Sequence, residues 1–287
     1  MQQKTCIIIS GPTAVGKTEF SIALAQKHNA RIISADSRQC FTELNIGVAK
    51  PTPGQLAAVR HYFINTHSIH EEVNVKIFEQ YALGTVQQLF DLDDVVVMVG
   101  GTGLYIKAFC EGLDEVPAVN ESIRNRINDD YQRKGIEWLQ SEIQRQDPVF
   151  FSSGEMRNPQ RIIRALEVKI STGRSLFDFH SGKKIKRDFN IKTINLEIPR
   201  SELYEKIDRR VDAMMNAGLL KEAESLFPFR KLNALQTVGY KELFDFIEGK
   251  PLPGGRKNSL ENAVEEIKKN TRHFAKRQMT WFKKFSA

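Results

Sequence analysis

The chain has 287 residues, of which 41% are hydrophobic and 27% are charged. This length suits one large domain or two small ones with a substantial core. The longest apolar runs have strand length, far below the ~20 residues of a membrane-spanning helix, so we expect no membrane span. A strand pattern begins at Cys6, so we also expect no secretory leader. Three cysteines without C-x-x-C spacing indicate neither a disulfide framework nor a zinc site, and favour a reducing cytoplasm.

The net charge is +7, from 42 Lys and Arg against 35 Asp and Glu. Such an excess is typical of proteins that bind nucleic acid or polyphosphates, but it also occurs as ordinary solubility charge. The position of the basic residues in the fold must therefore decide between these interpretations.

Strand and helix patterns alternate over the first 110 or so residues. Apolar runs predict strands at 6–10, 31–35 and 94–99, with a further strand at 62–65. Helical periodicity is seen at 17–27 and 75–90. The run at 94–99 is continuously apolar, as in a parallel strand buried on both faces. We therefore predict an α/β fold with a doubly wound parallel sheet.

The character of the chain changes at about residue 116. Helices are predicted at 121–134, 136–146 and 159–172, with a strongly basic surface that closes in Lys183-Lys184-Ile185-Lys186-Arg187. A strand pattern returns at 189–198, which indicates that 116–188 is an insertion into a sheet domain of 1–115 and 189–287. The remaining predicted elements are helices at 201–216, 219–227, 238–248 and 259–285, and a loop at 251–255.

A phosphate-binding loop follows the first strand. It fits G-x-x-x-x-G-K-[ST] and consists of Gly11, Pro12, Thr13, Ala14, Val15, Gly16, Lys17 and Thr18. The motif stands between a strand and a helix, where backbone N–H groups, the helix dipole and the Lys17 ammonium all favour an anion. The Thr18 hydroxyl is a candidate Mg²⁺ ligand. The alternative is a Gly-rich turn that holds no ligand.

Two further segments follow the carboxyl ends of predicted strands, where ligands bind in a parallel sheet. Asp36, after the second strand, is a candidate general base; alternatively it caps the next helix. The strand at 94–99 is followed by Gly100-Gly101-Thr102-Gly103, where an ATPase or GTPase usually carries a metal-binding carboxylate. Glycines permit close approach of a ligand, although a tight strand-to-helix turn explains them equally. The absent carboxylate argues against ordinary ATP hydrolysis.

These motifs resemble those of the bacterial tRNA dimethylallyltransferase (isopentenyltransferase) family. The resemblance extends over nearly the whole chain, in the family's order. It rests on the phosphate loop at 11–18, Ser-Ala-Asp-Ser-Arg-Gln at 34–39, Ile-Gly-Val-Ala-Lys-Pro at 46–51, Val-Gly-Gly-Thr-Gly-Leu-Tyr at 99–105, Asn-Pro-Gln-Arg-Ile-Ile-Arg-Ala-Leu-Glu at 158–167, Arg-Arg-Val-Asp-Ala-Met at 209–214, Val-Gly-Tyr-Lys-Glu at 238–242 and Thr-Arg-His-Phe-Ala-Lys-Arg-Gln-Met-Thr-Trp at 271–281.

The resemblance implies a P-loop NTPase-like sheet core with an inserted, mostly helical domain that contacts tRNA. It implies transfer of a dimethylallyl group from dimethylallyl diphosphate to N6 of adenosine 37, beside the anticodon, in tRNAs that read codons beginning with U. Asp36 would act as the general base. The phosphate loop, Lys17, Arg210 and Mg²⁺ at Thr18 would stabilise the leaving diphosphate. Arg209, the neighbour of Arg210, is interpreted as a solvated helix charge.

The resemblance also implies which residues contact the tRNA anticodon stem-loop. The residues around the flipped nucleotide would be Asp36, Ser37, Arg38, Gln39 and Thr102, and those on the anticodon loop Arg124, Gln160, Arg161, Ile162, Ile163 and Arg164. Gln160, Arg161 and Arg164 share one helical face, which is also typical of a solvated basic surface. We expect the protein to act as a monomer.

The last predicted helix has a basic face suited to backbone phosphates. That face carries Lys268, Lys269, Arg272, Lys276, Arg277, Lys283 and Lys284. Its apolar face is assigned to core packing rather than base stacking, and carries Val264, Ile267, Phe274, Trp281 and Phe282. Val48 and Cys40-Phe41 depart from the family pattern, which affects fine substrate contacts rather than the reaction class. The alternative functions are a small-molecule or nucleotide kinase, which shares the loop and a strand-two aspartate, and a non-catalytic RNA-binding module.

Overall fold

The computed structural model describes residues 4–251, 255 and 257–285. The chain divides into two compact units, which we call the sheet unit (1–112 and 186–287) and the helical unit (113–185). The sheet unit contains all the strands and the phosphate loop among the described residues, and the helical unit lies in the sequence between the first helix after the fourth strand and the fifth strand.

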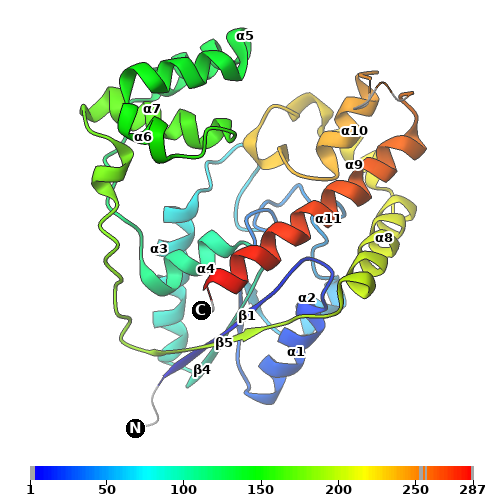
Figure 1. The fold of residues 1–287 in the computed structure, drawn as a ribbon. Helices are drawn as coiled ribbons and strands as arrows, with labels where there is room; N and C mark the ends of the chain where they lie inside the picture. Colours follow the sequence, from blue (N-terminus) through cyan, green and yellow to red (C-terminus); the bar gives the residue numbers. More distant parts are fainter. Residues whose placement is uncertain (1–3, 252–254, 256, 286–287) are drawn as a thin grey trace. The chain divides into compact units, whose positions relative to one another are not determined.

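The sheet unit is built on five parallel strands in the order β3-β2-β4-β1-β5. Their bounds are β1 Thr5–Ser10, β2 Ile32–Ser34, β3 His61–Tyr62, β4 Val95–Val99 and β5 Asn190–Asn195. The central strands are apolar on both faces, as parallel strands covered by helices must be. The α/β prediction with a parallel sheet is therefore confirmed (Figure 1).

Helices cover both faces of the sheet because successive strand residues point in opposite directions. On β4, Val97 packs in one apolar cluster with Ala25 of helix α1 (Lys17–Lys27). Val96 and Met98 face the opposite side, where they share the main core with helices α3 (Val75–Phe90) and α4 (Gly103–Glu111). The alternation thus buries the sheet between α1 and the α3–α4 pair (Figure 1).

The strand predicted at 62–65 is displaced in the structure. β3 ends at Tyr62 because Phe63 and Asn65 adopt positive φ angles of 59° and 54°, which an extended strand does not allow. β2 and β5 are shorter than predicted. A short helix that the sequence patterns did not indicate, α2 (Pro53–Ala58), starts at a capping box in which Thr52 and Gln55 exchange hydrogen bonds. Helix α4 was likewise not predicted.

The helical unit has its own core, formed by α5 (Glu121–Gln146), α6 (Pro148–Ser153) and α7 (Pro159–Thr172), followed by the 3₁₀ turn η1 (Leu176–Phe179). Gly135 interrupts α5 with φ 76° and ψ −172°, a backbone conformation open in practice only to glycine. The two helices predicted at 121–134 and 136–146 are therefore separated at a real kink. Helix α7 has the predicted bounds, from the Asn158 cap to a left-handed Gly173.

The C-terminal part of the sheet unit is helical. It comprises α8 (Arg200–Asn216), α9 (Leu219–Leu226), the 3₁₀ turns η2 (Phe227–Phe229) and η3 (Asn233–Leu235), α10 (Tyr240–Ile247) and α11 (Leu260–Phe285). These helices agree with the predicted ones within two residues at each end. Of the loop predicted at 251–255, residues 252–254 lie outside the described residues.

Arg187, expected on a basic surface, is instead largely covered within the sheet unit, with 10% of its side chain exposed. Its guanidinium donates to the carbonyls of Phe109 at 2.7 Å and Ala108 at 2.9 Å, which belong to the last turns of α4. It also pairs with Glu79 of α3 at 2.8 Å. Where the chain returns to the sheet unit, Arg187 therefore ties it to the point from which it left.

Candidate active site

The phosphate loop lies between the end of β1 and the start of α1, which is the strand–turn–helix context that the motif requires. Lys17 folds back over the loop, and its ammonium donates to the carbonyls of Gly11 at 3.0 Å and Pro12 at 2.7 Å. Burial lowers the pKa of Lys17 to about 8, and nearby Asp36 partly offsets that shift. The ammonium is thus held at the loop, ready for an anionic ligand.

Asp36 follows β2 and stands at the start of a turn at 37–40, not at the start of a helix as the capping interpretation required. Its Oδ1 accepts hydrogen bonds from the backbone N–H groups of Arg38 at 2.9 Å and Gln39 at 3.3 Å, which fixes this turn. No hydrogen bond from the described residues reaches Oδ2. The carboxylate also interacts electrostatically with Lys17 and Arg210, raising the pKa of each. Asp36 is therefore fixed by one oxygen and keeps the other available.

Thr102 lies beside the Asp36 segment although it comes from the β4–α4 loop. Its hydroxyl accepts from the Ser37 backbone N–H at 3.1 Å and donates to the Ser37 hydroxyl at 3.4 Å. Its own N–H donates to the carbonyl of Ala35 at 3.2 Å. These bonds join the loops that follow β2 and β4, which are neighbouring strands, at the carboxyl edge of the sheet.

The glycines at 100 and 101 allow other parts of the protein to approach the backbone closely. A Cβ on Gly100 would lie 2.1 Å from the carbonyl oxygen of Ala35, and one on Gly101 would lie 2.3 Å from Nε2 of Gln278. The interpretation as a tight, closely packed turn therefore explains these two glycines without a ligand. Gly101 and Thr102 of this turn line the larger cavity described below.

Arg210 and Arg209 of α8 have different surroundings. Arg210 is largely buried, and its Nη1 lies 3.4 Å from the Thr13 hydroxyl of the phosphate loop. Burial lowers the pKa of Arg210. Arg209 is 78% exposed and pairs with Glu205 one turn earlier. The interpretation of Arg209 as a solvated helix charge is confirmed.

A cavity of ≈ 440 Å³ in the sheet unit brings six of the predicted site residues together. These are Thr13, Asp36, Ser37, Arg38, Thr102 and Arg210. A second space of ≈ 50 Å³ is lined by Lys17, Thr18, Asp36 and Gln39, with Ser34 among its other lining residues. Asp36 lines both, so its carboxylate stands between the larger cavity and the phosphate-loop lysine.

Helix α11 supplies cavity residues that sequence reasoning assigned otherwise. Phe274 was placed with the core, but it is 40% exposed and lines the larger cavity together with Arg277 and Gln278. Ile267 and Phe282 are buried in the core as expected. Ile267, Thr271, Phe274 and Gln278 follow one another at intervals of three or four, so this face could have been found as a stripe that continues the apolar face.

The basic face of α11 is partly neutralised by acidic partners. Lys268 pairs with Asp212 at 2.8 Å and Arg272 pairs with Asp208 at 2.6 Å, both across to α8. Lys269 pairs with Glu266 one turn earlier. These three side chains of the predicted phosphate-binding face therefore already have acidic partners.

In the helical unit, the residues predicted to contact tRNA fall into three groups. Gln160 and Arg161 are exposed at the start of α7. Arg124 and Arg164 both pair with the buried carboxylate of Glu167, at 3.0 and 3.5 Å. Ile162 and Ile163 form the third group, and their side chains are 0% and 3% exposed. They lie in the core of the unit, on the face of α7 that packs against α5. The expectation that these two side chains contact the tRNA is therefore wrong.

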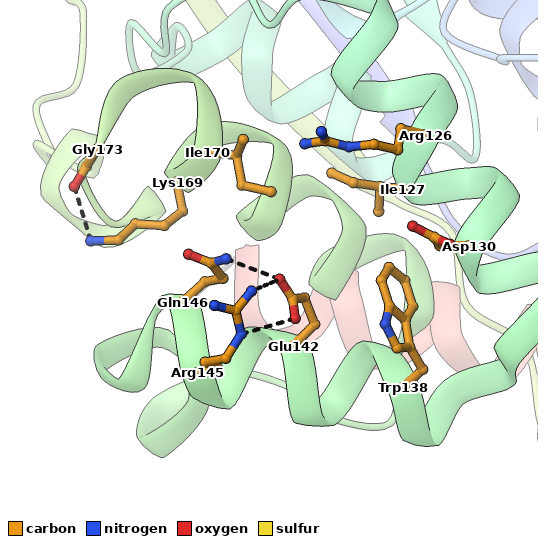
Figure 2. Close-up of a pocket in the computed structure, with 10 residues that line it drawn as sticks. All are labelled: Arg126, Ile127, Asp130, Trp138, Glu142, Arg145, Gln146, Lys169, Ile170 and Gly173. Carbon is orange, nitrogen blue, oxygen red and sulfur yellow. Dashed lines mark hydrogen bonds and ion pairs between the residues drawn. The ribbon is translucent and has the colours of Figure 1, made fainter.

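The helical unit also has a cavity of its own, of ≈ 490 Å³, between α5 and α7 (Figure 2). Trp138 lies along one side, and the carboxylate of Glu142 is held by Arg145 and Gln146 (Figure 2). Lys169 is bonded to the carbonyl of Gly173. None of the predicted site residues lines this cavity. Of its charged groups, Glu142 and Arg145 pair with each other, and Asp130 pairs with Arg133 and Lys134 of the same helix.

A magnesium ion would find few protein ligands. Within the described residues there is no group of three or more His, Cys, Asp or Glu side chains that could hold a metal. The smaller space does contain hard oxygen donors, namely the hydroxyls of Thr18 and Ser34 and the carboxylate of Asp36. This set fits an Mg²⁺ ion that takes most of its ligands from water and substrate phosphates.

Comparison with known proteins agrees with the resemblance carried by the motifs. The family model described as IPP transferase matches residues 39–285. The chain belongs to this family. A tRNA dimethylallyltransferase of Christiangramia forsetii is 48% identical over 97% of this chain and 90% of that protein. One from Flavobacterium johnsoniae is 44% identical over 98% of this chain and 91% of that protein.

Solved structures show the same IPP transferase fold. The full-length tRNA isopentenylpyrophosphate transferase of Bacillus halodurans is 33% identical, with a TM-score of 0.68 over 98% of this chain and 87% of that one. A eukaryotic dimethylallyltransferase acting on tRNA is 25% identical, with a TM-score of 0.77 over 97% of this chain and 69% of that one. Membership makes this chain an enzyme of the tRNA dimethylallyltransferase class. No helix of its described residues is long and apolar enough to cross a bilayer.

Proposed function

We propose that this IPP transferase moves a dimethylallyl group from dimethylallyl diphosphate to N6 of adenosine 37, on the 3′ side of the anticodon, in tRNAs that read codons beginning with U. Diphosphate is the other product. The observation that carries the proposal is that Asp36 and Arg210 line one cavity, beside a phosphate loop and at the carboxyl edge of a parallel sheet. A base and a cationic anion site are thus adjacent.

The phosphate loop and Arg210 hold the diphosphate. Negative charge grows on this group as its C–O bond to the allyl carbon breaks, so cations and backbone N–H groups in fixed positions lower the barrier. Arg210 already lies beside Thr13 of the loop, and Lys17 is close enough to Asp36 and Arg210 for all three to interact. On binding, the Lys17 ammonium exchanges the carbonyls of Gly11 and Pro12 for phosphate oxygens.

Asp36 takes the proton of the adenine amine. The lone pair of that amine is delocalised into the ring, so the nitrogen attacks efficiently only if its proton is accepted as the C–N bond forms. Oδ1 is already engaged with the backbone of Arg38 and Gln39, which leaves Oδ2 as the acceptor. Thr102 and Ser37, bonded to each other beside Asp36, orient the nucleotide after it has left the base stack.

Mg²⁺ belongs to the proposal through Thr18, with Ser34 and Asp36 nearby. When bound, the ion supplies positive charge to the oxygens of the departing diphosphate. The donor set of hydroxyls and one carboxylate is of the type that this ion prefers.

The tRNA anticodon stem-loop is the proposed macromolecular partner. Arg38 and Gln39 would contact the flipped nucleotide, whereas Gln160, Arg161 and Arg164 of the helical unit would contact the anticodon loop. Arg124, whose pairing with Glu167 leaves it 44% exposed, is a further candidate. We propose the division of labour predicted at 1–115 with 189–287 for catalysis and 116–188 for tRNA. We further propose a monomeric cytoplasmic enzyme.

The test is an incubation with an anticodon stem-loop and dimethylallyl diphosphate, followed by mass spectrometry of the RNA, with ATP as the control donor. We expect prenylated adenosine only with the allyl donor, and loss of product with retained RNA binding for Asp36→Asn. ADP formation with a small-molecule acceptor would instead identify a kinase. Unchanged product with Asp36→Asn would remove Asp36 from the chemistry, and no product with any donor would leave only an RNA-binding role.

A further inference from the structure

We infer that Glu222 of α9 is a positioning residue that clamps the turn formed by 45–50 against the larger cavity, an inference that rests on the proposed function for its catalytic consequence. The turn supplies three lining residues, Gly47, Val48 and Ala49. Glu222 does not line the cavity. Its effect on the reaction must therefore pass through the shape of this turn.

Both oxygens of the Glu222 carboxylate accept backbone hydrogen bonds from the turn. Oε2 accepts from the N–H of Ile46 at 2.8 Å, and Oε1 accepts from the N–H of Gly47 at 2.9 Å. Two adjacent amides thus point at one anion, an arrangement that an ionised carboxylate fits and a neutral amide side chain does not. These bonds join residues 176 and 175 positions apart, so local sequence does not reveal them.

Tyr240, the first residue of α10, completes the clamp. Its hydroxyl donates to Oε1 of Glu222 at 2.5 Å, and the ring is fully buried. Burial raises the pKa of Tyr240, and the hydrogen bond to Glu222 raises it further, so the phenol stays protonated and remains a donor. A Cβ on Gly47 would lie 2.6 Å from Cζ of Tyr240, so the glycine lets the turn rest directly on this ring.

The other side of the turn is held by Gln39. Its side-chain amide donates to the carbonyls of Val48 at 3.3 Å and Ala49 at 3.1 Å. The backbone N–H of Gln39 in turn donates to Oδ1 of Asp36. A continuous set of contacts therefore runs from the Glu222 carboxylate through the turn and Gln39 to the proposed general base.

This arrangement separates two parts of the site. The clamp supports the cavity wall and Asp36, whereas the phosphate loop is held by its own contacts with Gln278 and Arg210. Loosening the clamp should thus slow the transfer step by roughly 10- to 100-fold, since small displacements of reacting groups have effects of this size. The KM for dimethylallyl diphosphate should change less than about twofold if the phosphate loop is undisturbed.

The experiment compares Glu222→Gln with Glu224→Gln, a matched loss of charge at an exposed position of the same helix. Steady-state kinetics on the anticodon stem-loop, measured below the melting temperature of both variants, should show the fall in kcat for Glu222→Gln alone. Tyr240→Phe, which keeps the ring under Gly47, should cause a smaller fall. The double variant should lose less than the product of the two separate effects, because both remove the same clamp.

Amide hydrogen exchange tests the clamp without relying on activity. The Ile46 and Gly47 amides should be protected in the wild type and in Glu224→Gln and lose protection in Glu222→Gln. Equal protection in all three would overturn the inference, as would equal kcat for the two variants or an effect confined to the KM of dimethylallyl diphosphate. Lack of prenyl transfer by the wild type would refute the proposed function while the exchange experiment still decides the clamp.

Discussion

Thr13 and Gln278 are joined by a hydrogen bond of 2.8 Å, from the backbone N–H of the phosphate-loop residue to Oε1 of the α11 side chain. The Nε2 of the same side-chain amide donates to the carbonyl of Gly101 at 2.9 Å. Gln278 therefore fastens the phosphate loop to the loop after β4, using its acceptor on one and its donor on the other.

This relationship predicts the effect of Gln278→Glu. The carboxylate keeps the acceptor for Thr13 but loses the donor to Gly101, and it places a negative charge beside the proposed diphosphate site. We expect the affinity for dimethylallyl diphosphate to fall about tenfold or more, equivalent to ~1.4 kcal/mol. Isothermal titration calorimetry measures it, with Thr280→Ala on the exposed side of α11 as the control. Equal affinity in both variants would refute the role of Gln278.

Lys17 predicts a pH dependence of diphosphate binding. Its pKa in the free protein is about 8, and an anion at the loop favours the protonated form. Above pH 8, binding must therefore take up a proton, and the affinity should fall as the pH rises from 8 to 9. Calorimetry in buffers of different ionisation enthalpy measures the proton uptake. It should disappear in Lys17→Ala, whose tRNA affinity should stay near that of the wild type.

The lowered pKa of Lys17 also makes the stability of the folded protein depend on pH. In the unfolded chain Lys17 has its ordinary pKa of 10.5, so between pH 8 and 10.5 the unfolded state binds more protons. The contribution of Lys17 to the free energy of unfolding should therefore rise with pH across this window. Urea unfolding of the wild type and Lys17→Met at pH 7.5 and 9.5 would reveal it as a difference in slope; parallel pH dependence would contradict a lowered pKa.

Arg161 offers the clearest test of RNA contact in the helical unit, because it is 61% exposed and its partner Glu155 is itself exposed. We expect Arg161→Gln to weaken binding of the anticodon stem-loop and to reduce the log–log salt slope by about one for a lost phosphate contact. Filter binding at several salt concentrations measures both quantities. Arg157→Gln, another exposed position nearby, is the comparison. An unchanged slope would mean that Arg161 does not touch phosphate.

Gly135 predicts a stability effect. Alanine cannot adopt φ 76° and ψ −172° without strain, so Gly135→Ala should lower the free energy of unfolding by about 1–3 kcal/mol. Glu137→Ala, exposed in the same helix, should change it by less than ~0.5 kcal/mol. Chemical denaturation followed by circular dichroism compares them. A more stable Gly135→Ala would mean that α5 runs straight through this position.

The sequence predicted correctly those elements that are determined by residues close together in the chain. The apolar run of β4 and the Gly135 break in α5 could both be recognised in the sequence, since strand burial and glycine act within a few residues. The displacement of β3 could not, because the positive φ of Phe63 depends on its packing against surrounding aromatic rings. The burial of Ile162 was missed for a related reason: a family motif names positions without saying which face of a helix they occupy.

Long-range contacts account for the remaining gaps in the candidate site. The sequence indicated Asp36 and Arg210, which stand in recognisable motifs. It did not indicate Glu222, because the two backbone amides that this carboxylate binds are about 175 residues away. Gln278 stood in a motif, but its role as a link between two loops became visible only from the distances.

Arg187 holds together the two places where the chain leaves the sheet unit and returns to it. The arginine fixes the returning chain to the carbonyls of Ala108 and Phe109, so both ends of residues 113–185 are attached to the same compact unit. The intervening 73 residues are then a replaceable module whose two attachment points do not depend on its contents. On the division of labour proposed above, exchanging this unit with those of other family members at these points would change RNA selectivity and keep the prenyl-transfer chemistry.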